Sequence, residues 1–268
     1  MTSLVMATAH PDPVCSPTGS ALRGAIPDPK AGRGYRRPIS AQPPPVEPGS
    51  KDIGTLNEGS LHAGLKEWLW EPGDQLEVPM GEFVIDVVRG NLLIEVQTGS
   101  FAAMGRKLDH LLEHHPIRLV HPVAVESWLI REGMSDRRSP KKGDVYSIFD
   151  ELVSIPTLLD HPNLEIDLVL VIEEQIRAPG AELRRGRGGW HIVDRRLREV
   201  IEIHRFATPT DIDALVPDVL DEGFTTSDIA RACAISRDRA QRVAYTLRAM
   251  GRFEQIGRDR QGIRYRRT

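Results

Sequence analysis

The spacing of apolar residues between positions 57 and 134 changes repeatedly between helical and strand-like periods. Leu61, Leu65 and Leu69 recur at the intervals of one helix face, and Asn57 is a suitable residue for the start of that helix. Further apolar runs, bounded by breakers, predict strands at 75–78, 83–89, 92–98, 117–125 and 128–131, and a helix from Ser100 that ends before Pro116. This alternation predicts an α/β fold built on a mixed sheet with flanking helices.

Residues 135–206 read as an α/β extension or connector in which no chemistry is recognised. The segment opens with the basic, breaker-rich sequence SDRRSPKKG at 135–143. The predicted elements that follow are a helix at 145–159 interrupted at Pro156, a strand at 164–176, a basic glycine-rich loop at 184–189, a short strand from Trp190 and a helix at 195–203 capped by Asp194. A flexible arm that contacts DNA phosphates is one use of the loop.

The C-terminal residues 207–268 show three short helical patterns followed by two strand patterns. The helices are predicted at 211–220, 226–233 and 237–250, and the strands at 253–256 and 263–266. This order resembles a winged helix-turn-helix domain, and the resemblance covers nearly all of the segment. It implies a small DNA-binding domain whose third helix enters the major groove.

Composition limits the remaining choices. The 268 residues are enough for about two domains, and the 40% hydrophobic and 27% charged content is that of a soluble globular protein. Residues 1–50 hold half of the 20 prolines and few large apolar residues, which predicts a disordered tail. With only Cys15 and Cys233, a disulfide framework or a Cys-x-x-Cys zinc site is not expected. No apolar run is long enough to span a membrane and no signal pattern is present, so a cytoplasmic location is expected.

Two acidic residues stand out inside the apolar hairpin. If Gly90-Asn91 closes it, Val87 pairs with Ile94 and Asp86 with Glu95, and Gln97 follows two residues later on the same face. Directly opposed residues in a sheet have Cβ atoms only about 5 Å apart, where like charges are destabilising. The pair therefore predicts either a shared proton or a bound cation.

Asp86 followed by Glu95-Val96-Gln97 at the end of an apolar strand resembles the PD-(D/E)xK nuclease superfamily. The order helix, three strands, helix and strand between residues 57 and 131 matches the core of that family, which places the nuclease-like core at 51–134. The resemblance implies that Asp86, Glu95 and the backbone carbonyl of Val96 hold Mg²⁺ or Mn²⁺. Gln97 occupies the position of the usual lysine, so the role of that lysine is either lost or moved, and Lys107 or Arg106 on the next helix could supply the positive charge. The resemblance also makes Glu58 a further acidic group at the site, although a favourable charge in the first helical turn explains Glu58 equally well.

The charge of the C-terminal domain favours nucleic acid. Between Gly223 and Thr268 there are 11 arginines and 4 acidic residues, a net charge of +7, whereas the whole chain carries −3. Arginines on the third helix suit the major groove, and arginines on the wing suit phosphates. The expected DNA contacts are Arg237, Arg239, Arg242, Arg258, Arg260 and Arg264.

Three functions are consistent with these patterns. The first is a metal-dependent DNA endonuclease guided to DNA by its winged helix, for which cutting of both strands would favour a homodimer. The second is a DNA-binding regulatory protein whose nuclease-like core is inactive, a hypothesis motivated by Gln97 at the lysine position. The third is a structural adaptor that binds proteins through both domains, which requires the arginine excess to be incidental.

Overall fold

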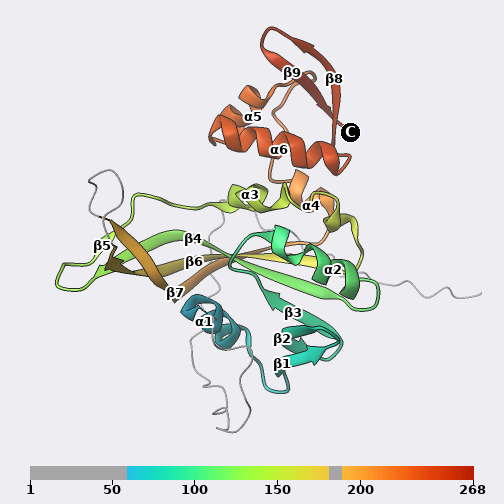
Figure 1. The fold of residues 1–268 in the computed structure, drawn as a ribbon. Helices are drawn as coiled ribbons and strands as arrows, with labels where there is room; N and C mark the ends of the chain where they lie inside the picture. Colours follow the sequence, from blue (N-terminus) through green and yellow to red (C-terminus); the bar gives the residue numbers. More distant parts are fainter. Residues whose placement is uncertain (1–58, 181–188) are drawn as a thin grey trace, which may run out of the picture. The chain divides into compact units, whose positions relative to one another are not determined.

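The computed structural model describes residues 59–180 and 189–268, and its main feature is a seven-stranded mixed sheet (Figure 1). The expected tail at 1–50, Glu58 and most of the glycine-rich loop lie outside these residues. The strand order is β1-β2-β3-β4-β6-β7, with β5 paired to β4. The strands are β1 (Gln75–Met80), β2 (Phe83–Arg89), β3 (Leu92–Val96), β4 (Ile117–Arg131), β5 (Arg137–Arg138), β6 (Leu164–Pro179) and β7 (Trp190–Phe206).

The first six elements follow the order expected from the sequence. Helix α1 (Ser60–Leu69) precedes three antiparallel strands, β1 to β3, and the short helices η2 (Phe101–Met104) and α2 (Gly105–Leu111) then lead into β4. Strand β4 runs parallel to β3, because the intervening helices carry the chain back across the sheet. The predicted hairpin register is confirmed: Arg89 pairs with Leu92, Val88 with Leu93 and Val87 with Ile94. Gly90 has a φ of 61°, which a residue without Cβ adopts at little cost.

The two faces of the sheet bury different sets of side chains. Helix α1 covers one face, where Leu61 and Leu65 pack against residues such as Val120 and Val169. The opposite face packs against α2 and against α3 (Ile148–Leu152), using Leu119 and Leu168. Strands β4 and β6 are therefore apolar on both sides, which explains why their sequences read as nearly continuous hydrophobic runs.

Strand β7 corrects the sequence-based prediction of a helix at 195–203. Residues 190–206 form one antiparallel strand on β6, and the pairing contains three register shifts. Each shift inserts an extra residue in β7, so Leu197 and Val200 both reach the apolar layer beneath α1 although they are three residues apart. Because of the bulges, buried apolar residues of this strand are three positions apart, which is a spacing typical of a helix. Gly64 of α1 allows close packing there, since a Cβ at this position would lie 3.2 Å from Leu197 Cβ.

Two smaller predictions also change. The two strands expected at 117–125 and 128–131 are one strand, β4, which continues through a register shift between Ala124 and Glu126. The basic linker contributes β5, whose Arg138 pairs with Trp128 of β4 and stacks on its ring at 5.1 Å. Segment 135–206 is thus part of the same sheet as the core.

The C-terminal residues form three helices and a two-stranded sheet, in the order of a winged helix-turn-helix. The elements are α4 (Pro209–Asp213), α5 (Thr226–Ala232), α6 (Arg237–Ala249), β8 (Phe253–Asp259) and β9 (Gly262–Arg267). The first helix is shorter than the predicted 211–220, because Pro217 has no N–H to continue it. Ala234, with a φ of 53°, forms the tight turn between α5 and α6.

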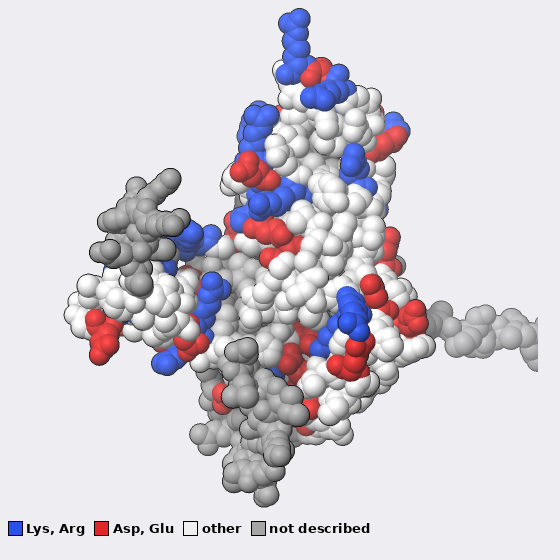
Figure 2. All heavy atoms as spheres, viewed as in Figure 1, with Lys and Arg blue, Asp and Glu red and all other residues white. Residues whose placement is uncertain are grey.

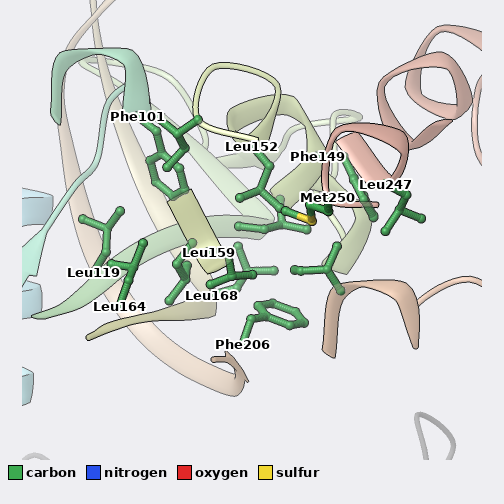
Figure 3. Packing of buried hydrophobic residues seen from close by; sticks show 14 of the residues in the cluster. Phe101, Leu119, Phe149, Leu152, Leu159, Leu164, Leu168, Phe206, Leu247 and Met250 are labelled. Carbon is green, nitrogen blue, oxygen red and sulfur yellow. The ribbon is translucent and has the colours of Figure 1, made fainter. Parts of the chain in front are cut away.

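The winged-helix elements share one hydrophobic cluster with the α3 face of the large sheet. Figure 3 shows Leu247 and Met250 on the side of α6 that meets Phe149 and Leu152 of α3. Phe206, the last residue of β7, belongs to the same cluster. Within residues 59–180 and 189–268, no helix is long and apolar enough to cross a membrane.

Candidate active site

Asp86 lies on β2 just beyond the last residue pair of the β2–β3 ladder. The backbone N–H of Val96 donates a hydrogen bond of 2.8 Å to Asp86 Oδ2, and His62 Nε2 lies 3.2 Å from the same oxygen. Burial raises the pKa of Asp86, but the hydrogen bonds from His62 and Val96 and the charge of Lys66 together hold this pKa below its usual value. Asp86 is therefore ionised at neutral pH.

Glu95 lies on the neighbouring strand β3 and is only 5% exposed. Lys107 of α2 reaches it, with Nζ 2.6 Å from Glu95 Oε1 and 2.6 Å from the carbonyl oxygen of Val84. Burial and the nearby charge of Asp86 raise the pKa of Glu95 to about 7, although Lys107 acts in the opposite direction. Lys107 thus contacts Glu95, and Asp86 lies near enough for its charge to act on Glu95.

The two carboxylates have opposite environments. Asp86 takes its hydrogen bonds from α1 and β3, whereas Glu95 pairs with α2 on the other side of the sheet. The prediction that the two carboxylates share one face is therefore wrong. Because the β2–β3 ladder ends at Val87 and Ile94, Asp86 accepts the Val96 N–H instead of pairing backbone to backbone with Glu95. The pair consequently holds one full negative charge and a second group poised between charged and neutral near pH 7.

Asp86 and Glu95 are the acids of the predicted site that could contribute oxygens to a Mg²⁺ or Mn²⁺ ion held largely by water. Within the described residues, no group of three or more His, Cys, Asp or Glu side chains is placed to hold a metal ion. Mg²⁺ characteristically binds proteins through one or two carboxylates, keeping several waters and adding substrate phosphate oxygens. The contacts described above use one oxygen of each carboxylate: Asp86 Oδ2 accepts a hydrogen bond, and Glu95 Oε1 forms an ion pair with Lys107. A divalent cation would also neutralise the repulsion that raises the pKa of Glu95.

Other predicted site residues have structural contacts of their own. The Gln97 side-chain amide donates to the carbonyl oxygen of Ser100 at 2.8 Å, so it holds the turn into η2. Val96 is 3% exposed, and its backbone N–H donates a hydrogen bond to Asp86. Arg106 pairs with Glu82, so of the two candidate cations it is Lys107 that contacts Glu95. Glu58 lies outside the described residues.

Sequence reasoning gave no role to several groups around this site. His62 and Lys66 lie one helical turn apart on α1, and Lys66 forms an ion pair with Glu77, whose φ of 54° is unusual for a residue with a side chain. His121 donates from Nδ1 to the carbonyl oxygen of Gln97 at 2.7 Å. The four-residue spacing of His62 and Lys66 was a usable signal, whereas nothing local in the sequence marks His121.

The arginines expected to contact DNA divide into four groups. Arg239 and Arg242 of α6 turn toward α3: Arg239 pairs with Asp144 and Asp150, and Arg242 Nη1 lies 2.6 Å from Asp150 Oδ1. Arg264 is held within the wing by Asp259 and by the carbonyl oxygen of Gly223. Figure 2 likewise shows acidic side chains beside basic ones over the face in view.

Arg237 and Arg258 instead line an open groove of about 370 Å³ between α6 and the wing. Its walls also include Gln241, Tyr245 and Arg248, which follow Arg237 at helical spacing on one face of α6. Arg260 lies exposed in the turn between β8 and β9. The outward face of α6 is therefore rotated from the one predicted, because Arg239 and Arg242 lie on the side that meets α3.

Comparison with known proteins places the sheet and its helices in one family. The family described as "Domain of unknown function (DUF8091)" matches residues 59–207, more than half of the chain. The chain belongs to the DUF8091 family. A protein of Treponema pallidum (strain Nichols), named "Uncharacterized protein", is 31% identical over 188 residues, which cover 67% of this chain and 74% of the relative. No solved structure matches this chain.

The DUF8091 segment ends at residue 207, next to Phe206, the last residue of β7. It therefore contains Asp86, Glu95 and Lys107 together with α3. The winged-helix elements, from α4 to β9, follow it in the chain. The DUF8091 fold thus carries the candidate active site, while the arginine-lined groove belongs to the C-terminal segment.

Proposed function

We propose that this protein is a Mg²⁺- or Mn²⁺-dependent deoxyribonuclease that hydrolyses phosphodiester bonds in DNA delivered by its C-terminal winged helix. The observation that carries the proposal is the ion pair of Lys107 with Glu95, a buried acid whose pKa is raised by the charge of nearby Asp86. A buried glutamate paired with a lysine and near a partly buried aspartate, on a core with the PD-(D/E)xK order of elements, suits hydrolysis of a phosphate ester better than a purely structural role.

Each residue has a distinct task in this proposal. Asp86 and Glu95 bind the ion through their oxygens, with the Val96 carbonyl as a third expected ligand, and His62 and the Val96 N–H hold Asp86 in one orientation. When bound, the ion lowers the pKa of a coordinated water and stabilises the charge that develops on the phosphate. Lys107 brings a positive charge to the same place, as the family lysine does, and replaces Gln97 in that task.

The groove between α6 and the wing suits the DNA backbone and base edges. Arg237, Arg248 and Arg258 line it with Gln241 and Tyr245, a combination of cations, an amide and an aromatic ring. DNA as partner, cytoplasmic location and a homodimer that cuts both strands are parts of the same proposal.

A non-catalytic DNA-binding regulator is the second candidate. The specific observation in its favour is that the Gln97 side chain is tied to Ser100, so the usual lysine position contributes no charge to the site. In that protein Lys107 would only neutralise Glu95, and the sheet would serve as a scaffold.

The deciding experiment combines calorimetric titration of Mg²⁺ or Mn²⁺ with cleavage assays on duplex, branched and single-stranded DNA. We expect Asp86→Ala to lose metal binding and cleavage, and Lys107→Met to keep metal binding while losing about 100-fold or more of the cleavage rate. Glu113→Ala is the matched control, because the Glu113 side chain is 73% exposed. Salt-sensitive DNA binding without metal binding or cleavage would overturn the nuclease and support the regulator.

A further inference from the structure

Helix α3 contacts both α6, the helix proposed above to contact DNA, and the helical segment that carries Lys107. Its Asp150 receives Arg239 Nη2 at 3.0 Å and Arg242 Nη1 at 2.6 Å from α6. The next residue, Glu151, accepts the backbone N–H of Phe101 through Oε2 at 3.0 Å. Adjacent residues of one short helix therefore hold two elements that are far apart in the sequence.

The contact with Phe101 fixes the start of the segment that carries Lys107. Phe101 is the first residue of η2, is fully buried, and packs edge-on against His121 with ring centroids 5.0 Å apart. The first N–H groups of a helix have no partner within the helix, so a carboxylate that accepts one both satisfies it and favours the helix dipole. Six residues later, Lys107 meets Glu95. Any displacement of the segment start moves Lys107 relative to that carboxylate.

The contact with α6 is more than a single surface ion pair. The Arg239 side chain is 24% exposed and donates to both Asp144 and Asp150, and Arg242 adds a second cation to Asp150. Such half-buried, multiply bonded arginine–carboxylate contacts are stronger than isolated exposed pairs. Phe149 and Leu152 lie on the same helix and pack into the cluster that includes Leu247. Helix α3 is thus held to α6 by charge and by apolar contact.

We propose that Asp150 and Glu151 are positioning residues that fix Lys107 relative to the DNA-reading helix α6. The inference rests on the function proposed above. DNA bound in the groove orders α6, α6 holds α3 through Asp150, and Glu151 holds the start of the Lys107 segment. Because coupling between two sites is reciprocal, stabilising one end of this chain of contacts stabilises the other.

Hydrogen exchange of the amides at 101–111, measured on the full chain, tests the proposal without requiring cleavage. We expect Glu151→Ala to exchange about tenfold faster there, the effect of losing one hydrogen bond to a charged group. Glu151→Gln keeps an oxygen that accepts the Phe101 N–H and should restore most of the protection. Equal exchange in the wild type and Glu151→Ala would overturn the role of Glu151, and so would Glu151→Gln exchanging as fast as Glu151→Ala.

A double-mutant cycle tests the link to α6. If Asp150 acts through Arg239, then Asp150→Ala and Arg239→Ala each accelerate exchange at 101–111, and the double variant adds little to either. If Arg239→Ala leaves this exchange unchanged, Asp150 stabilises only α3, and α6 is not coupled to the segment that carries Lys107. Asp160→Asn, an exposed acid near α3, is the control and should have no effect.

Addition of mixed-sequence duplex DNA completes the test. DNA should slow exchange at 101–111 in the wild type and leave it unchanged in Arg239→Ala. A wild type that binds DNA without this slowing overturns the coupling, even if it cleaves DNA. Normal coupling in a protein that cleaves no substrate would instead overturn the nuclease and keep Asp150 and Glu151 as a structural link.

Discussion

At the scale of single residues, the informative contrast lies between Asp86 and Glu95. Both are acids in apolar strands, yet Asp86 accepts two hydrogen bonds at one oxygen, whereas Lys107 and the backbone of Asp86 offset the burial of Glu95 only in part. Environments that push two neighbouring pKa values apart are typical of functional sites. The difference between the two pKa values depends on which hydrogen-bond donors and charges surround each carboxylate, so it cannot be predicted from the residue types alone.

This contrast predicts an unusual pH dependence of stability in metal-free buffer. The pKa of Glu95 is raised from 4.5 to about 7, so the folded chain binds more protons than the unfolded chain between these values. The free energy of unfolding should therefore fall as the pH rises from about 4.5 to 7, by at most about 3 kcal/mol. Asp86, whose pKa is lowered, contributes stability that is lost only at lower pH, as the pH falls below 3.8 and through its folded pKa.

Urea denaturation of the wild type and Glu95→Gln at pH 5, 6, 7 and 8 checks this. The Glu95→Gln variant should show a flatter profile, because glutamine does not titrate and keeps a similar shape. A wild-type profile that rises between pH 5 and 7 and is unchanged by the substitution would show that Glu95 is ionised at all these values.

At the scale of elements, helix α6 has three faces that make different contacts. Val243 and Leu247 face the core, Arg239 and Arg242 face α3, and Arg237 and Tyr245 face the groove beside the wing. The helical period of 3.6 residues separates these sets around the helix. In the proposed function, the groove face is the one that meets DNA while α6 stays bound to α3.

This division predicts which arginines set the salt dependence of DNA binding. Arg237→Ala and Arg258→Ala should each weaken binding and reduce the slope of log K against log salt by about 0.9 for each phosphate that the arginine neutralises. Arg242→Ala, with the same change of charge on the same helix, is the matched control and should leave the slope unchanged. Fluorescence anisotropy at several salt concentrations measures both quantities. A smaller slope in Arg242→Ala alone would place DNA on the α3 side.

At the scale of the whole molecule, the C-terminal segment and the DUF8091 fold share apolar contacts. Phe149, Leu168 and Phe206 belong to one cluster with Leu247 and Met250, as Figure 3 shows. A tether between independent domains would leave each of these groups in a separate core. The continuous cluster therefore favours cooperative unfolding of both parts.

Phe149→Ala tests this cooperativity. Phe149 is fully buried, so the substitution should cost about 3–5 kcal/mol of the free energy of unfolding. All 4 tryptophans precede residue 207, so their fluorescence reports the DUF8091 fold, whereas circular dichroism also reports α5 and α6. The urea midpoints measured by the two signals should fall together in Phe149→Ala. The control Val219→Ala, at a side chain 76% exposed, should change neither midpoint. Two separate transitions in the wild type would contradict a shared core.

The sequence by itself determined the local features. The Gly90-Asn91 turn and the β-branched runs around it fixed the hairpin register, and the continuous apolar runs marked β4 and β6 as strands buried on both faces. These features depend on residues a few positions apart, so their spacing is visible in the chain. The order of elements followed from the same signals, and the family resemblance pointed to Lys107, which contacts Glu95 in the structure.

Only the tertiary structure decided which distant groups meet. Residues 195–203 form a strand because pairing with β6, with bulges that bring Leu197 and Val200 to the same layer, outweighs a helical spacing. Arg239 lies against Asp150 because the apolar faces of α3 and α6 pack together, and Glu95 has a raised pKa because the fold buries it beside Asp86. Burial, long-range pairing and charge proximity are properties of the folded arrangement, so no local pattern in the chain specifies them.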